Sequence, residues 1–234
     1  FTVKPGQFVA IVGGTGTGKS SLVNLIPRFY DATSGEVKVF GRDVKEYPLA
    51  ELRRLVGTVP QKAAVVSGTI RENLLWGDEN ATQEQVEEAC RAAQAHDFIS
   101  AFDDGYGHML SQKGTNVSGG QRQRILIARA VAANPQILVL DDSSSALDYK
   151  TDASLRRALA ENMKDSTIIT VAQRVSSVKS CDVILVLDEG RIAGIGTHSE
   201  LMENCEVYRQ IAHSQLSQKD LAAIDNAKGG AVNA

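Results

Sequence analysis

Short apolar runs alternate with stretches of helical periodicity along most of this chain. The apolar runs have the length of single buried strands, and several end in glycine, proline or aspartate, which are typical of turns. This order predicts an α/β fold in which helices cover a mostly parallel sheet. The expected strands are residues 8–12, 37–40, 55–60, 137–140, 167–171 and 183–188, with a closing hairpin strand at 191–194.

The middle of the chain has a different character. Residues 84–95 repeat apolar and small side chains at helical spacing, and no strong strand pattern appears between residues 61 and 120. We therefore expect a helical subdomain inserted into the α/β core. The expected organisation is a core with a small antiparallel β region at 1–62, the helical subdomain at 63–125, the rest of the core at 126–213 and a disordered tail at 214–234.

Composition adds few constraints. The chain has 234 residues, of which 43% are hydrophobic, enough for a sizeable core. Its 25 basic and 28 acidic residues nearly balance, which gives no overall electrostatic reason to expect a nucleic-acid partner. The three cysteines are scattered, and the four histidines lack metal-ligand spacing. The scattered cysteines favour a reducing, cytosolic setting. Because no apolar run approaches the roughly 18 residues of a membrane span, we also expect a soluble polypeptide.

A glycine-rich loop directly follows the first expected strand. The run GGTGTGKS lets consecutive backbone N–H groups point at phosphates, and Lys19 adds a positive charge. Ser20 opens a helix expected at 21–27, where its hydroxyl can ligate Mg²⁺. A nucleoside triphosphate is therefore the first ligand to consider, the alternative being a merely flexible loop. The expected phosphate-binding residues are Gly13, Gly14, Thr15, Gly16, Thr17, Gly18, Lys19, Ser20 and Ser21.

A carboxylate ends another strand of the same predicted sheet. The buried-strand pattern at 137–140 leads into Asp141, and open α/β sheets bind ligands at the carboxyl ends of their strands. Asp141 is therefore the expected outer partner of Mg²⁺, bound through water. A helix cap or turn residue is the alternative.

A second anion-binding surface is predicted at Ser118, Gly119, Gly120 and Gln121. Ser118 stands where a helix starts, so its hydroxyl and the following N–H groups face outward from the helix N-terminus. One triphosphate cannot use both surfaces within one chain. A face-to-face dimer would place each nucleotide between one chain's phosphate loop and the other's serine-glycine turn. A simple capped helix is the alternative.

Together these motifs resemble the nucleotide-binding domain of an ATP-binding cassette (ABC) transporter, matched from residue 1 to about 213. The resemblance implies a P-loop NTPase (RecA-like) core that binds ATP and Mg²⁺. Residues 13–20 and 137–141 resemble the Walker A and Walker B motifs, and 117–121 the signature motif, with Val117 where Leu is usual. Gln61 resembles the Q-loop glutamine, which in the family touches Mg²⁺ beside the membrane domain. Residues 145–148 resemble the D-loop, which crosses the dimer interface.

The segment at 66–77 resembles the exporter branch of the family, in which this domain follows six membrane helices. Trp76 within it could equally be a core or interface aromatic. The start at Phe1 favours a piece of a longer protein, whose upstream part would hold the adenine-stacking aromatic. The resemblance implies a transmembrane domain as partner and a location at the cytoplasmic face of the cell membrane.

Two residues depart from the family pattern. Asp142 stands where a catalytic glutamate is usual, and its carboxylate is pulled back by roughly 1 Å. Gln173 stands where a histidine is usual, and an amide cannot carry the positive charge of an imidazolium. Both changes weaken hydrolysis more than binding. The chain thus resembles the degenerate subunit of a heterodimeric exporter, whose second nucleotide-binding domain belongs to a different subunit.

Other interpretations remain open at this stage. A regulatory module that binds ATP without hydrolysing it is the main one. A DNA-repair or chromosome-structure ATPase would need a long coiled coil between Lys19 and Ser118, where no sustained heptads occur. A translation-associated protein would carry two such cassettes. The basic residues Arg122, Arg124 and Arg129 favour a solvated or interface face rather than nucleic-acid binding.

Overall fold

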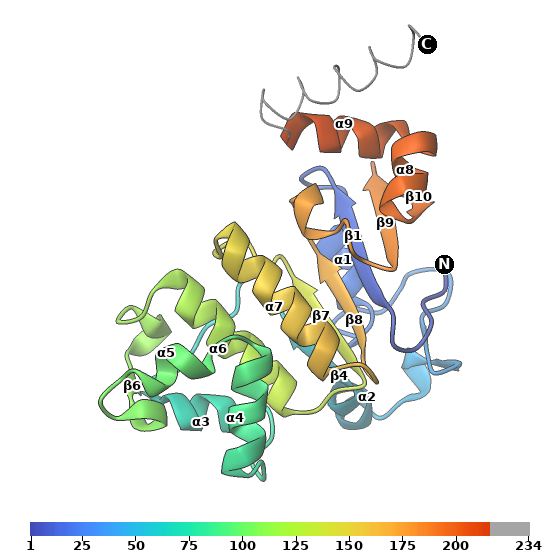
Figure 1. Ribbon diagram of the computed structural model, residues 1–234. Coiled ribbons are helices and arrows are strands. Elements are labelled where there is room, and N and C mark those ends of the chain that lie inside the picture. Colours follow the sequence, from blue (N-terminus) through green and yellow to red (C-terminus); the bar gives the residue numbers. More distant parts are fainter. Residues whose placement is uncertain (216–234) are drawn as a thin grey trace, which may run out of the picture.

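The computed structural model describes residues 1–215 and has a six-stranded sheet at its centre (Figure 1). The strand order is β10-β9-β1-β8-β7-β4. All neighbouring pairs are parallel except β10 with β9, the hairpin at one edge. The predicted α/β fold with a mostly parallel sheet is confirmed. The strands are β1 (Phe8–Gly13), β4 (Val56–Val59), β7 (Ile137–Asp141), β8 (Thr167–Val171), β9 (Val183–Asp188) and β10 (Arg191–Gly196).

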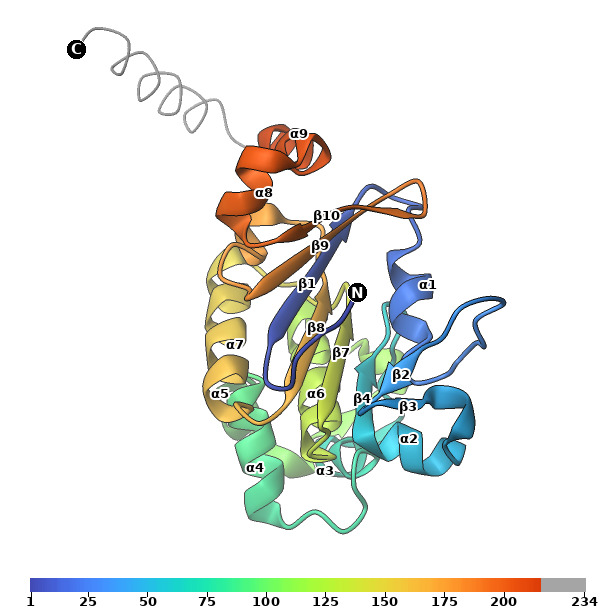
Figure 2. The same cartoon turned by 90° about the vertical axis from the view of Figure 1, so that its right-hand side faces the viewer.

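Helices cover both faces of the sheet, which explains why the inner strands β1, β7, β8 and β9 are largely apolar and buried. Val9 and Ile11 of β1 pack in one cluster with side chains of α1 and α2. Ala10 and Val12 of the same strand pack on the other face with α8 and α9. Figure 2 shows α1 and α2 on one side and α7 on the opposite side. The bounds are α1 (Lys19–Asn24), α2 (Leu49–Leu55), α7 (Tyr149–Asn162), α8 (His198–Asn204) and α9 (Glu206–Gln215).

Two small antiparallel pairs lie outside the main sheet. β2 (Lys38–Val39) pairs with β3 (Arg42–Asp43), and β5 (Gly68–Thr69) pairs with β6 (Met109–Leu110). The strand expected at 37–40 is shorter because Phe40 and Gly41 form the hairpin turn. Both have a positive φ, 50° and 79°, as a two-residue turn with the right twist requires.

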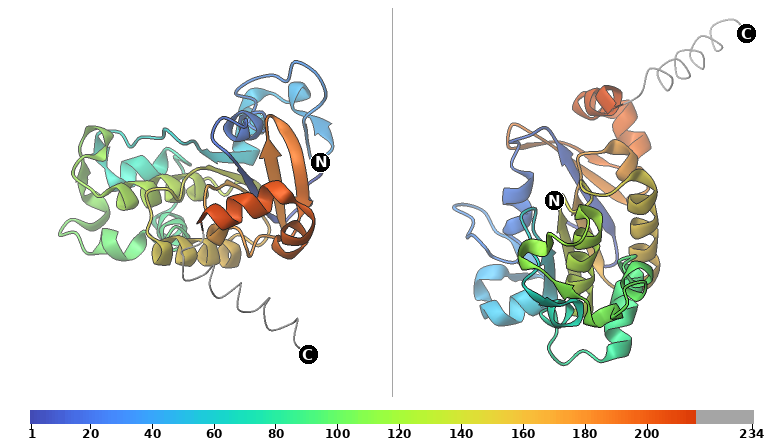
Figure 3. Two further views of the ribbon diagram at one scale, coloured as in Figure 1. Left: turned by 90° about the horizontal axis from the view of Figure 1, so that it is seen from above. Right: turned by 90° about the vertical axis from the view of Figure 1, so that its left-hand side faces the viewer.

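The helical subdomain extends from one side of the core (Figure 3). It holds α3 (Ile70–Leu75), α4 (Gln83–Ala92), α5 (His96–Ser100) and the start of α6 (Gly119–Ala132). Leu74, Val86 and Ile125 of this subdomain share one apolar cluster with Leu138 and Leu140 of the sheet. The expected boundary at residue 125 therefore falls inside α6, a continuous helix that packs on both parts.

Several element ends differ from the sequence-based expectation. Leu55 ends α2 and does not begin the strand. The helix expected at 21–27 ends at Asn24, because the N–H groups of the next residues bond three positions back and Arg28 has a φ of 53°. The tail was expected from residue 214, but α9 continues to Gln215; residues 216–234 lie outside the described part. None of the helices in residues 1–215 combines the length and apolarity needed to cross a bilayer.

Candidate nucleotide-binding site

The loop between β1 and α1 has the backbone conformation that its glycines predict. Gly18, just before α1, has a φ of 92°, in the left-handed region that favours glycine. A Cβ on Gly13 would lie 2.3 Å from the carbonyl oxygen of Leu187. Thr17 Oγ1 donates to the Gly14 carbonyl across 2.9 Å, which closes the loop on itself. The glycines thus permit both the turn and its close contact with β9.

Lys19 is folded onto this loop. Its Nζ donates to the carbonyl oxygens of Gly13, at 2.9 Å, and Gly14, at 2.6 Å. Burial lowers the pKa of Lys19, while the nearby Asp142 and Asp141 carboxylates raise it. These contacts hold a cation at the mouth of the loop, where an anionic ligand would meet it.

Ser20 and Asp141 come together from α1 and β7. The Ser20 hydroxyl donates to Oδ1 of Asp141 across 3.0 Å, and Asp141 is 3% exposed. Burial raises the pKa of Asp141, opposed by the Ser20 hydrogen bond and by Lys19. Two oxygen ligands side by side, one of them a carboxylate, suit a hard cation such as Mg²⁺. The residues present therefore fit the metal that the sequence predicts.

Asp142 accepts two amide hydrogen bonds. Nε2 of Gln173 lies 2.8 Å, and Nε2 of Gln61 3.3 Å, from the same Oδ2. The backbone of Asp142 has a φ of 51°, a conformation that aspartate tolerates better than most residues. Burial and the neighbouring Asp141 raise its pKa, while the Gln61 and Gln173 hydrogen bonds and Lys19 lower it. Side chains from the ends of β4, β7 and β8 thus converge on one carboxylate.

These groups border a cleft of about 490 Å³. Ile211, Ser214 and Gln215 of α9 also line it, although the sequence analysis did not assign them to the site. α9 begins only eight residues before the tail expected at 214, and its sequence gave no signal that its end reaches the phosphate loop. The remaining lining residues are Gly13, Gly14, Thr15, Gly16, Gly18, Lys19, Ser20, Ser21, Gln61, Asp141, Asp142, Val171 and Gln173.

The predicted second surface is separate from this cleft. Ser118 is exposed at the N-cap of α6, and among the described lining residues none comes from 118–121. Its Oγ accepts from the Gln121 backbone N–H at 3.1 Å, and Oε1 of Gln121 accepts from the Ser118 N–H at 2.9 Å. Ser118 and Gln121 therefore cap α6 through a reciprocal capping box, with Gly119 and Gly120 in its first turn.

The arginines of α6 do not form a fully solvated face, which was one of the two alternatives expected, and the interface alternative stays a prediction. All three are half-buried. Arg124 lies over the Phe98 ring at 4.6 Å and donates to the Gln94 carbonyl at 2.6 Å. Arg122 and Arg129 also donate to backbone carbonyls within residues 63–125. Their aliphatic stems pack against neighbouring elements while the charged ends bond backbone oxygens.

The segment after Asp142 links α7 to the site. Ser145 Oγ donates to the Asp142 carbonyl at 3.0 Å, and the Leu147 carbonyl accepts from Arg174 at 3.1 Å. Asp148 then caps α7 by accepting from the Thr151 N–H at 2.9 Å. Trp76, at the end of α3, is 68% exposed, so the core alternative for this aromatic is wrong.

The fold and the site together define a nucleotide-binding protein of the phosphate-loop class. A family model described as "ABC transporter" matches residues 1–145, and the chain belongs to the ABC transporter family. It is 43% identical over 219 residues to the uncharacterized ABC transporter ATP-binding protein YfiB of Bacillus subtilis, covering 94% of this chain. It is 43% identical over 218 residues to ABC transporter B family member 4 of Dictyostelium discoideum, covering 93%. The chain spans only 38% and 28% of these two relatives.

A solved structure agrees with this assignment. The structure of a bacterial Atm1-family ABC exporter with ATP bound superposes with a TM-score of 0.89 and 35% sequence identity. The match covers 93% of this chain and 38% of the exporter chain. The sheet, the helical subdomain and the C-terminal helices described above therefore have their counterpart in one part of a larger protein.

Proposed function

We propose that this chain is the ATP-binding domain of an exporter, where it binds MgATP and couples ATP binding and hydrolysis to transport across a membrane. The solved exporter with ATP bound supports this proposal, as does the gathering of Lys19, Ser20 and Asp141 at the phosphate loop. Its working location is then the cytoplasmic face of the cell membrane, next to a fused or associated transmembrane domain. The exposed Trp76 is available for such a contact, and no nucleic-acid partner is proposed.

The chemistry follows from the groups around the cleft. Lys19 neutralises charge on the β- and γ-phosphates, and the glycine-loop N–H groups orient them. Ser20 and Asp141, with Gln61 nearby, would hold Mg²⁺, which supplies charge stabilisation when bound. Asp142 would accept the proton of the attacking water, and Gln173 would donate a hydrogen bond to the γ-phosphate.

One observation carries the finer proposal that this site is only weakly hydrolytic. Asp142 and Gln173 occupy the positions where the family usually has glutamate and histidine, and they bond each other at 2.8 Å. The shorter side chain holds its carboxylate farther from the water, and the neutral amide cannot supply a positive charge. A displacement of about 1 Å can lower a rate on the order of 10²-fold.

The second anion surface belongs to a partner's site in this proposal. The exposed Ser118 lies outside the cleft that the phosphate loop borders. A second nucleotide-binding domain, from a different subunit with glutamate and histidine at the equivalent positions, would receive Ser118, Gly119, Gly120 and Gln121 against its own nucleotide. This chain's cleft would in turn be closed by the partner's signature motif.

The ATPase rate, measured with and without such a partner, tests the proposal. We expect slow turnover by the chain alone and a clear rise in the mixed complex. Asp142→Glu should raise the rate at this chain's own site by about 10- to 100-fold. Rapid turnover by the isolated wild-type chain would refute the proposal that this site hydrolyses ATP only weakly.

A regulatory module without hydrolysis is the second candidate, and the same Asp142 and Gln173 favour it. Labelled ATP held in the complex for many hours, with no release of phosphate from this chain's site, would select it. A variant carrying both Asp142→Glu and Gln173→His should gain turnover under either candidate, because both attribute the low rate to these two residues. Phosphate release from the wild-type site in the mixed complex is therefore the measurement that separates them.

A further inference from the structure

The last turn of α9 bonds directly to the segment that carries Gln173. Oε1 of Gln215 accepts from the backbone N–H of Val175 at 2.7 Å, and its Nε2 donates to the Gln173 carbonyl at 2.6 Å. One amide side chain thus bridges two backbone groups that are two residues apart. Within residues 1–215, neither backbone group has another hydrogen-bond partner.

This bridged segment begins where the sheet has ended. β8 stops at Val171, and the N–H of Ala172 makes the last bond to the neighbouring strand, donating to Ile11. From Gln173 on, the backbone depends on contacts from outside the sheet. The Arg174 guanidinium donates to the Leu147 carbonyl and lies 4.8 Å from the centre of the Tyr149 ring. Both contacts hold the side chain of Arg174 and not its backbone. Gln215 holds the main chain at Gln173 itself.

The geometry connects Gln215 to the reacting end of the cleft. The Gln173 backbone is fixed by Gln215, and the Gln173 side chain reaches Asp142 at 2.8 Å. Ser214 and Gln215 also line the cleft beside the phosphate loop. A shift of the Gln173 backbone would move its amide away from both Asp142 and a bound γ-phosphate.

We propose that Gln215 is a positioning residue for Gln173, so that recognition of the γ-phosphate depends on the end of α9. This inference rests on the proposed function, because it assigns Gln173 to the γ-phosphate. The inference goes beyond the proposed function because it makes α9 part of the nucleotide site. Gln215 itself acts through the backbone of Gln173 and need not touch the nucleotide.

The test compares affinities for MgATP and MgADP, measured at equilibrium on the full 234-residue chain. Gln215→Ala should weaken MgATP binding by about three- to tenfold, the effect of losing one or two neutral hydrogen bonds, and leave MgADP binding unchanged. Gln215→Glu keeps an acceptor for Val175 but loses the donor, so its effect should be intermediate. Gln210→Ala is the control, since Gln210 is exposed on the same helix and, among residues 1–215, its side chain bonds only Glu206. It should change neither affinity.

Double mutation separates positioning from a general structural effect. If Gln215 acts through Gln173, Gln215→Ala should have no further effect on MgATP binding in a Gln173→Ala background. Equal weakening of MgATP and MgADP by both Gln215 variants, or additive effects in the double mutant, would overturn the inference. A loss of ATP preference in Gln173→Ala but not in Gln215→Ala would refute this inference alone. No change in Gln173→Ala would refute the proposed role of Gln173 and this inference with it.

Discussion

Nε2 of Gln173 lies 2.8 Å from Oδ2 of Asp142, so the two residues that we interpret as departures from the family pattern are bonded to each other. Gln61 donates to the same oxygen at 3.3 Å. Two amide hydrogen bonds orient this carboxylate and stabilise its charged form. Both departures therefore act on one group, and their effects on hydrolysis should not be independent.

The burial of Asp142 predicts a pH-dependent stability. Its pKa is raised in the folded state, first by burial and then by Asp141. The folded state therefore binds the proton more tightly than the unfolded state, and this contribution to stability is lost as pH rises through the folded pKa. Asparagine does not titrate, so Asp142→Asn should not lose this stability as pH rises, and its amide oxygen can still accept from Gln173. Between pH 3.5 and pH 7, the free energy of unfolding of the variant should therefore rise relative to wild type by up to about 1 kcal/mol. Solvent screening at this half-exposed group sets that limit.

Urea unfolding without nucleotide or Mg²⁺ at both pH values measures this difference. An advantage of Asp142→Asn that stays the same at pH 3.5 and pH 7 would contradict the assignment of the pKa shift to the folded state.

Ser118 and Thr82 allow the effect of helix capping on stability to be separated from a role in ATP hydrolysis. Each caps its helix through the same reciprocal capping box. Ser118→Ala and Thr82→Ala should each lower the free energy of unfolding by about 1 kcal/mol. Only Ser118→Ala should also reduce ATP hydrolysis by the mixed complex, because only Ser118 is proposed to face the partner's nucleotide. Equal activity of the two variants would argue against the shared site.

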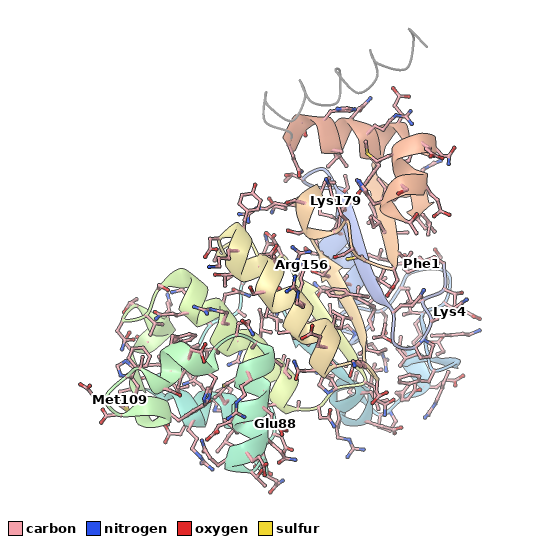
Figure 4. The ribbon with its side chains drawn as sticks, viewed as in Figure 1. Phe1, Lys4, Glu88, Met109, Arg156 and Lys179 are labelled. Carbon is pink, nitrogen blue, oxygen red and sulfur yellow. The ribbon has the colours of Figure 1, made fainter. Side chains whose placement is uncertain are left out.

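A buried carboxylate of α7 bonds both to the segment after Gln173 and to an arginine of its own helix. Asp152 is 1% exposed, accepts from Ser177 at 2.6 Å and pairs with Nη2 of Arg156 at 3.2 Å; Arg156 is labelled on α7 in Figure 4. Arg156→Ala leaves a buried carboxylate without its cation, so we expect a loss of about 3 kcal/mol in urea unfolding. The adjacent Arg157 is exposed, and Arg157→Ala should change stability by less than about 0.5 kcal/mol. Similar losses in both variants would show that the ion pair contributes nothing specific.

Close packing at Gly77 holds the helical subdomain together. A Cβ on this residue would lie 2.0 Å from the carbonyl oxygen of Arg129 in α6. Gly77→Ala should therefore lower the thermal midpoint and cost about 3 kcal/mol, because backbone must move to relieve the overlap. At Gly107 a Cβ would meet only Asp104, at 3.8 Å, so Gly107→Ala is the matched control with little expected effect. A Gly77→Ala protein as stable as this control would contradict the packing.

The strands and the phosphate loop could be predicted because their signals are local. A buried parallel strand is apolar throughout, and the loop needs glycines at fixed spacing beside Lys19 and Ser20. Element ends were less well predicted. The Phe40–Gly41 turn and the early end of α1 depend on single backbone conformations that the apolar pattern does not encode.

The sequence by itself therefore determined the fold class and the resemblance to the family, and it supplied the hypothesis about Asp142 and Gln173. Only the tertiary structure decided which side chains meet. The convergence of Gln61 and Gln173 on Asp142, the burial of the α6 arginines and the contact of Gln215 with the Gln173 backbone all join distant parts of the chain. Local sterics and hydrogen bonding specify a loop or a strand from neighbouring residues. Such long-range contacts arise only when the strand order and the packing of helices place those residues side by side.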